Sequence, residues 1–377
     1  MRLRTFALAL TSTAAALAAG TARADDAFSI SGFASAVAGK VTSGERREDY
    51  LRYPCPCFIA DYGHGAMYGP TWTAKQESKL GVQASYAFTP GVSATAQVVA
   101  RGVEGQQLGL EWAYLSWDLS PSWTLQVGRK RLPLYYYSDF QDVGYAYTWV
   151  RPPTDIYGWE IVNYNGLNAT YRGDWGGWAV KSNLLAGGET TRDNLYQHLY
   201  YDTVQDVSWK RIVGADLVFS RDWLTVRATY IQSDVQQWDR DNDERVTPAP
   251  DSERSSEKQR IYGVSANADI GNWFVRSEYS VFDRSSYSYK SRAYMVGAGV
   301  RLGRFTPMLT RSKYGESNRF APDAIQHDTG WSATLRYELN ESTALKLQVD
   351  RFKDRSGPEL DFVGHSRLVS FSLDTVF

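Results

Sequence analysis

The sequence predicts an all-β protein, an up-and-down antiparallel barrel of about sixteen strands that crosses a membrane. Apolar and polar residues alternate with period two in segment after segment, so that each strand has one apolar and one polar face. Aromatic residues make up 14% of the chain, with 25 Tyr and 13 Trp. The connections alternate between short turns and long loops. Together these features are typical of membrane-spanning barrels, which have short turns at one end and long loops at the other.

Residues 1–24 have the features of a cleaved export signal. Arg2 and Arg4 form its charged start, a mostly apolar run follows, and a small-x-small cleavage site ends at Ala24. The apolar run is too short to span a bilayer as a helix, which disfavours the alternative of an uncleaved anchor. We therefore predict that residues 25–377 form a single barrel domain.

The charge of the mature chain gives no indication of a nucleic-acid partner, and none is predicted. Cleavage removes three arginines and no acid, so that 41 basic residues fall to 38 against 42 acidic ones, a charge near −4. A near-neutral, slightly acidic balance gives no electrostatic basis for binding nucleic acid. The mature sequence also has no run of 18 apolar residues, so no transmembrane helix is predicted.

The predicted strands are separated by residues that favour turns. Thr89-Pro90-Gly91, Ser120-Pro121-Ser122 and Gly271-Asn272 join neighbouring strands tightly. Strands of about ten residues are long enough to cross an outer membrane at a tilt. The predicted strands cover residues 28–40, 77–88, 92–101, 108–119, 123–128, 161–172, 177–186, 209–219, 223–232, 260–270, 273–282, 292–302, 305–314, 331–339, 343–353 and 367–377.

The third long loop directly follows the fifth strand and is about thirty residues long. It is the most distinctive part of the sequence. It contains many aromatic residues and shows no strand pattern. A loop of this length in a compact fold is usually functional. We predict that it folds into the barrel and narrows the channel. Its aromatic rings have two interpretations: packing that holds the loop against the wall, or a stacking surface for a solute.

Charged residues on the polar strand faces are expected to line a water-filled lumen, where they tune which ions pass or merely keep the lumen wettable. Opposed charges across a narrow channel would create a transverse field. The predicted pore constriction combines acids of the third loop with Arg151 and a basic wall: Asp139, Asp142, Asp155, Lys79, Arg101, Lys130, Arg172, Arg227 and Arg276. Further basic candidates for the lumen are Lys181, Arg301, Arg336 and Lys346.

Cys55 and Cys57 lie in the first long loop, in the sequence Pro-Cys-Pro-Cys. Export to the cell surface favours a disulfide. We expect a strained local bond between the two, with an intermolecular disulfide as the second possibility. A metal site with His64 is a less favoured third, so no metal site is predicted.

No catalytic constellation is recognisable. The four histidines, His64, His198, His327 and His365, fall in predicted loops and not beside a nucleophilic serine on a strand. The glycines around residue 300 sit within a strand pattern and so do not form a nucleotide fingerprint. We therefore predict that the protein is not an enzyme and binds no cofactor.

Three short motifs carry a resemblance to a known family. They are the strand start Glu77-Ser78-Lys79-Leu80-Gly81, the strand end Gly128-Arg129-Lys130 before the third long loop, and a last strand that ends on Phe377. In their order and spacing the chain resembles the Gram-negative trimeric porins over its mature length. The resemblance implies a third loop that forms a constriction and a terminal Phe that assists assembly. It also implies a homotrimer in the outer membrane, among lipid and lipopolysaccharide.

These features predict a passive, water-filled channel for ions and small hydrophilic solutes. A substrate-selective channel that uses the aromatic third loop as a solute-binding site is the first alternative. A structural or adhesive barrel with a closed lumen is the second. For assembly, the outward faces of strands one and three carry small residues, including Ala94 and Ala96, which let protein surfaces approach closely within a membrane.

Overall fold

The computed structural model of the chain describes residues 27–45, 55–103, 108–201, 203–248, 253–284, 289–357, 359–360 and 363–377. The predicted export signal, residues 1–24, lies outside the described residues. Within them, no helix is long and apolar enough to cross a membrane.

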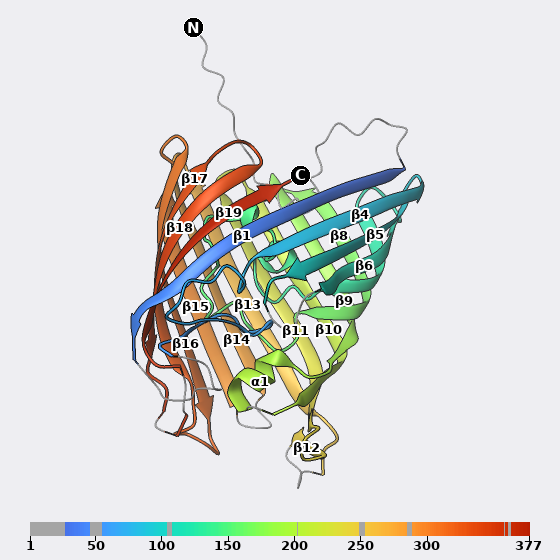
Figure 1. The fold of residues 1–377 in the computed structure, drawn as a ribbon. Helices are drawn as coiled ribbons and strands as arrows, with labels where there is room; N and C mark the ends of the chain where they lie inside the picture. Colours follow the sequence, from blue (N-terminus) through green and yellow to red (C-terminus); the bar gives the residue numbers. More distant parts are fainter. Residues whose placement is uncertain are drawn as a thin grey trace.

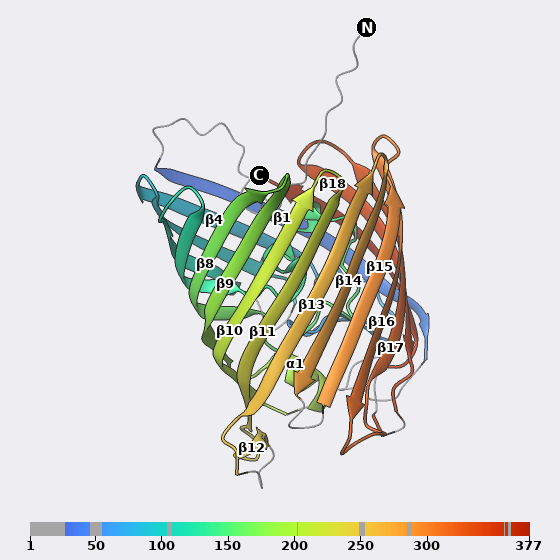
Figure 2. The same cartoon turned by 180° about the vertical axis from the view of Figure 1, so that it is seen from behind.

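Sixteen antiparallel strands form a closed barrel, which confirms the predicted fold class (Figures 1 and 2). Each strand pairs with its neighbours along the chain, and the first pairs with the last to close the wall. The wall strands are β1 (Phe28–Gly44), β4 (Lys79–Thr89), β5 (Val92–Arg101), β6 (Leu108–Asp118), β7 (Trp123–Arg131), β8 (Asn163–Trp175), β9 (Trp178–Thr191), β10 (Gln205–Arg221), β11 (Leu224–Asp239), β13 (Glu257–Ile270), β14 (Trp273–Arg284), β15 (Tyr289–Val300), β16 (Phe305–Asn318), β17 (His327–Glu338), β18 (Thr343–Asp354) and β19 (Ser366–Val376).

The short turns lie at the end of the barrel where the C-terminus is found, and the long connections lie at the other end (Figure 1). β12 (Glu244–Thr247) extends the long β11–β13 connection beyond the wall. Every predicted strand is present. Several continue further toward the long-loop end than predicted, as in β10 and β11, because their ladder hydrogen bonds continue where the apolar alternation has stopped.

The outer face of the barrel is apolar, as the alternation requires. Exposed outward residues include Leu80, Leu115 and Val264, with tryptophans nearer the strand ends. Such an aromatic girdle suits the headgroup level of a membrane. The outward tryptophans are Trp117, Trp123, Trp175, Trp223, Trp273 and Trp331.

The lumen holds an apolar core as well as polar groups, which the simple alternation does not predict. The third long loop, L3 (residues 132–162), packs its rings against inward residues of β10 to β16, among them Trp209 and Ile231. The described part of the first long loop, L1 (residues 55–78), also folds inward. Its hairpin of β2 (Phe58–Asp61) and β3 (Ala66–Tyr68) packs against β1, β18 and β19.

The fourth long loop brings a short helix, α1 (Leu195–Tyr201), to the long-loop end of the lumen. Its Tyr196 ring lies 6.0 Å from Tyr62 of L1 and 5.6 Å from Trp159 of L3, measured between ring centroids. Three loops that are distant in sequence therefore meet inside one barrel.

Candidate pore constriction

Asp142 of L3 lies at the centre of a buried charge cluster. Its carboxylate accepts hydrogen bonds from Arg131 at 2.7 Å, Arg101 at 2.9 Å and Lys79 at 3.3 Å. Burial by itself would raise the pKa of Asp142, but the surrounding cations outweigh it and hold this pKa well below its usual value. Asp142 therefore stays ionised, and the cations on the barrel wall that it faces balance its negative charge.

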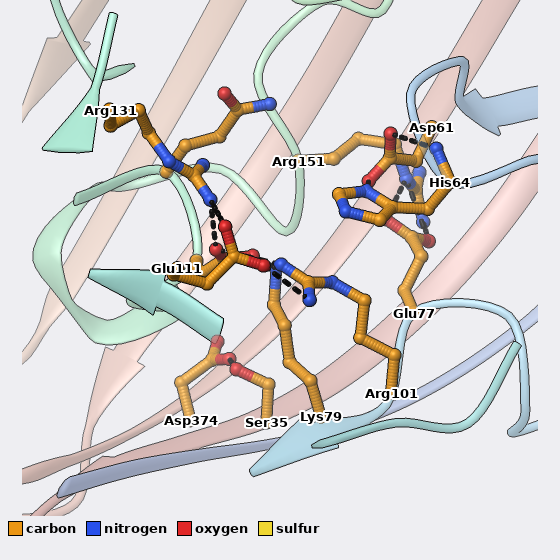
Figure 3. Close-up of polar contacts among 12 residues, drawn as sticks. Ser35, Asp61, His64, Glu77, Lys79, Arg101, Glu111, Arg131, Arg151 and Asp374 are labelled. Carbon is orange, nitrogen blue, oxygen red and sulfur yellow. Dashed lines mark hydrogen bonds and ion pairs between the residues drawn. The ribbon is translucent and has the colours of Figure 1, made fainter. Parts of the chain in front are cut away.

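Glu111 completes the cluster through an irregularity of β6. The register of β5 against β6 shifts between Gln97 and Val98, so that Glu111 is an extra residue, a β-bulge. A bulge re-aims side chains, and here it turns the carboxylate into the lumen. Glu111 lies 2.8 Å from Arg101 and 2.7 Å from Arg131 (Figure 3).

Arg151 joins L3 to L1 and to the wall. Its Nε lies 2.8 Å from the Oε1 of Glu77, and its Nη1 lies 2.6 Å from the Oδ2 of Asp350. The guanidinium also lies near the rings of Phe58 and Tyr68 of the L1 hairpin. We conclude that Arg151 fixes two loops and one strand in one arrangement.

Several wall cations hold the L3 backbone and do not stand free in the channel. Arg227 donates to the carbonyls of Pro133 and Tyr135 and pairs with Asp216. Lys346 donates to the carbonyls of Gly144 and Trp149 in the same way. Arg227 was predicted as a charge lining the constriction, so its position corrects that prediction: its charge is used to dock the loop.

Asp155 was predicted to face a basic wall, and the structure does not place it there. It is buried against β16 and β17 and interacts with Ser312, while its Oδ2 has no hydrogen-bond partner among the described residues. Burial raises the pKa of Asp155 to about 6. The prediction failed because spacing along a loop does not show which side of the loop faces the channel.

Three cations on neighbouring strands have no carboxylate partner within 4 Å among the described residues. They are Lys130 on β7, Arg172 on β8 and Lys181 on β9, and Arg172 pairs directly with Lys181 in the strand register. Lys130 hydrogen-bonds Gln126 and lies 5.3 Å from the centroid of the Tyr114 ring. Asp139, an exposed residue of L3, is close enough to interact electrostatically with Lys130.

Arg276 belongs to a separate pair. It lies 2.9 Å from Asp269 on β13, which also accepts a hydrogen bond from Arg301. The cavity around Asp142 is lined by four of the ten predicted constriction residues, Lys79, Arg101, Asp142 and Arg151. The other six lie elsewhere in the lumen.

The sequence reasoning missed Arg131, Glu111 and Glu77. Arg131 ends the basic run that follows Gly128, so its position at a strand end before L3 was an available signal. Glu111 interrupts the alternation of β6, a sign of the bulge that aims it inward. Glu77 had no sequence signal, because its partner Arg151 is 74 residues away.

Cys55 and Cys57 form a disulfide in the structure, with Cα atoms 4.3 Å apart. Cys57 is fully buried in the apolar cluster of L1. The bond thus lies at the base of the hairpin that enters the lumen.

The match to a protein family settles the class of the protein. A family model described as Gram-negative porin matches residues 11–357. The chain belongs to the Gram-negative porin family. It is accordingly a passive channel of the outer membrane. No curated protein sequence matches the chain.

Solved structures show the same fold at low sequence identity. The outer membrane channel DcaP of Acinetobacter baumannii is 13% identical, with a TM-score of 0.59, over 93% of this porin and 97% of that chain. The OmpF of Salmonella typhi, in complex with daunomycin, gives the same values. An anion-selective porin from Comamonas acidovorans is 13% identical, with a TM-score of 0.56, over 93% and 99% of the two chains.

Proposed function

We propose that ions and small hydrophilic solutes cross this porin between L3 and the wall formed by β4 to β9, with a weak preference for anions. L3 and L1 fill the lumen on the other sides with apolar clusters. Most inward side chains of β4 to β9 are polar, and among them Gln83, Gln97, Gln126, Asn168 and Thr170 hydrogen-bond to one another or to neighbours. A wall of this kind is wetted and suits a diffusion path.

The arrangement of ion pairs supports the preference for anions. The cluster around Asp142 pairs three cations, Lys79, Arg101 and Arg131, with two acids, Asp142 and Glu111, so most of its charge is compensated at close range. Lys130, Arg172 and Lys181 have no carboxylate within 4 Å among the described residues, and Asp139 acts on Lys130 only from a greater distance. Charges at the channel surface act over about 8–10 Å in physiological salt, so only those on the path matter. This group of lumen cations without ion-pair partners among the described residues is the observation that carries the proposal.

The alternative, a solute-binding site made by the aromatic rings of L3, has less support. Tyr135, Tyr137, Trp149, Tyr157 and Trp159 are all buried, and Trp149 is only 1% exposed. Tyr135, Tyr157 and Trp159 border the cavity around Asp142, but each is at most 4% exposed, so these rings offer little face to a sugar or an aromatic solute. The packing interpretation therefore accounts for these residues.

The assembly we propose is a homotrimer, exported through a cleaved signal at residues 1–24 and surrounded by lipid and lipopolysaccharide. The outward face over β4 to β7 carries a shallow groove lined by Ala84, Ala94, Ala96 and Ala113. Small side chains of this kind let a second copy approach closely. We further propose that the channel has no catalytic activity, consistent with its family.

Reversal potentials in a potassium chloride gradient test the proposed path. The wild-type porin in planar bilayers should show open channels with a modest anion preference. Replacing Lys130, Arg172 and Lys181 with Gln should abolish that preference, whereas Lys258→Gln together with Arg304→Gln, two exposed positions away from the lumen, should not. A cation-selective wild type, or equal shifts in both variants, would contradict the proposal.

A further inference from the structure

Two aromatic side chains stand on the mostly polar wall that the proposed solute path follows. Trp112 and Tyr114 of β6 come directly after the bulge at Glu111 and face the lumen, where they pair with Gln97 and Thr95 of β5. Both side chains are partly exposed. Neither belongs to the apolar clusters in which the rings of L3 and the L1 hairpin are packed. The two rings therefore form an aromatic surface that a solute on this path can reach.

The rings of Trp112 and Tyr114 lie side by side. Their centroids are 6.2 Å apart, and their planes are inclined by 49°. Aromatic rings attract one another at such separations, beyond the effect of burying apolar area. A planar solute ring that reaches this pair gains a contact of the same kind.

A lysine ammonium lies next to the two rings. The Nζ of Lys130 on β7 is 5.3 Å from the centroid of the Tyr114 ring, and it donates a hydrogen bond to Gln126. Gly128 lies between Lys130 and Gln126 on the same face of the strand and pairs with Tyr114. Because Gly128 has no side chain, Lys130 can extend along the wall. An ammonium group has three N–H donors, and Gln126 accepts one of them.

The charge on the wall beside the rings is positive. Arg172 and Lys181, which pair with each other across β8 and β9, interact electrostatically with Lys130. Two acids also act on Lys130, namely Asp139 and Asp216. Asp216 is buried in an ion pair with a wall arginine. Asp139 belongs to L3, on the opposite side of the path, so an anion on the wall side is attracted by three cations.

We propose that Trp112, Tyr114 and Lys130 form a subsite for carboxylates that carry an aromatic ring, with benzoate as the simplest example. The solute ring lies against the two aromatic side chains, and its carboxylate accepts a hydrogen bond from the Lys130 ammonium. Hydrogen bonds between charged groups are stronger than those between neutral groups. A sugar has no charge for the ammonium and an inorganic anion has no ring, whereas an aromatic carboxylate uses both parts of the site. The inference rests on the proposed solute path and names one class of solute for it.

The first experiment uses the wild type alone and so does not depend on the folding of a variant. Single-channel currents in planar bilayers at low potassium chloride are recorded with three probes of similar size: benzoate, cyclohexanecarboxylate and benzamide. Benzoate should block the current at a concentration about threefold or more below that of cyclohexanecarboxylate, because only benzoate offers an aromatic ring. Benzamide, which has the ring without the charge, should also block more weakly than benzoate. Equal block by benzoate and either of the other probes would overturn the proposal.

A second experiment removes parts of the subsite. The variant Trp112→Leu with Tyr114→Leu should block equally with benzoate and cyclohexanecarboxylate. The variant Lys130→Gln should weaken block by both carboxylates. The matched control, Trp117→Leu with Tyr230→Leu, removes two exposed rings from the outer face of the barrel and should behave as the wild type does. A preference for benzoate that persists in the first variant would overturn the proposal.

The proposed solute path is tested separately by the reversal potential of the wild type. A channel that prefers anions but does not distinguish benzoate from cyclohexanecarboxylate would overturn this inference and leave the path in place. A wild type that prefers cations would overturn the path, and the inference with it.

Discussion

Arg151 and Glu77 form a two-pronged ion pair, with the guanidinium Nε 2.8 Å from Oε1 and 2.9 Å from Oε2 of the carboxylate. The pair joins L3 to the end of L1, and both side chains are largely buried. Planar pairs of this kind fix geometry as well as contributing energy. This ion pair therefore holds the two loops that narrow the lumen together as one unit.

Arg151→Ala should loosen that unit. Removal of one partner leaves Glu77 and Asp350 as buried, unpaired charges, which typically costs about 3–5 kcal/mol. We expect larger and noisier single-channel steps and faster proteolysis within L1, with the barrel still resistant to detergent on unheated gels. The control is Arg211→Ala, whose side chain is 78% exposed and pairs with Asp234. Channel steps identical in size and noise to the wild type would contradict the role of Arg151.

The acids of L3 should differ in their effect on ion selectivity. Asp139→Asn and Asp142→Asn should each shift the reversal potential toward anions, because the first removes the acid near Lys130 and the second unbalances the cluster of Arg101, Arg131 and Lys79. Asp155→Asn should have little effect, since this side chain is buried away from the channel.

Asp241 and Asp243, on the long connection between β11 and β13, serve as the control for this series. They lie beyond the barrel wall, and charges separated by more than a Debye length are screened. Their conversion to Asn should leave selectivity unchanged. If this pair shifts the reversal potential as much as the L3 variants do, the constriction is not the selectivity element.

The stability of the porin should depend on pH through Asp155. Its pKa in the folded protein is about 6, above the usual 3.8, because burial favours the neutral acid. The folded state thus binds this proton more tightly than the unfolded chain. The acid carries no penalty below about pH 4 and becomes destabilising as the pH rises to 6, with a full cost on the order of 3 kcal/mol above that pH.

Asp155→Asn should remove this dependence. Unfolding followed by circular dichroism should show the variant to be more stable than the wild type at pH 8 and no more stable at pH 4. A variant that is less stable than the wild type at both pH values would mean that the carboxylate is favourably placed as an anion.

Ala94→Trp with Ala96→Trp should release monomers, because bulky rings on β5 would fill the shallow groove where a second copy is proposed to approach. Ala333→Trp, at an exposed outward position on β17, is the matched control and should leave the oligomer intact. Size on unheated gels and light scattering in detergent would report the outcome. Trimers of undiminished stability in the double variant would show that the contact lies elsewhere.

The sequence alone was enough to predict the barrel and its strand count. Alternation with period two is a local property of the chain, because successive side chains of a strand point to opposite faces and one face meets lipid. The turn residues are equally local, so that β5 (Val92–Arg101) was predicted with the bounds it has. The length and aromatic content of L3 also sufficed to mark it as an internal loop.

The constriction was decided by tertiary structure. The wall cations Lys79 and Arg101 were predicted from their strand faces, but their meeting with Asp142 depends on the path of L3 across the lumen. The contact of Arg151 with Glu77 joins residues that are far apart in sequence, and no local pattern encodes it. The entry of L1 was likewise not predicted, since its apolar residues are buried only by packing on β18 and β19.

For charged residues, the local sequence pattern shows which way a side chain points, whereas long-range packing decides which group it contacts. Strand periodicity shows that Arg227, Lys130 and Arg172 face the lumen, because direction follows from position in the strand. Only the folded chain shows that Arg227 donates to the carbonyls of L3, while Lys130 and Arg172 have no carboxylate within 4 Å among the described residues. A side chain's direction is a property of its own strand, whereas its partner comes from another part of the chain.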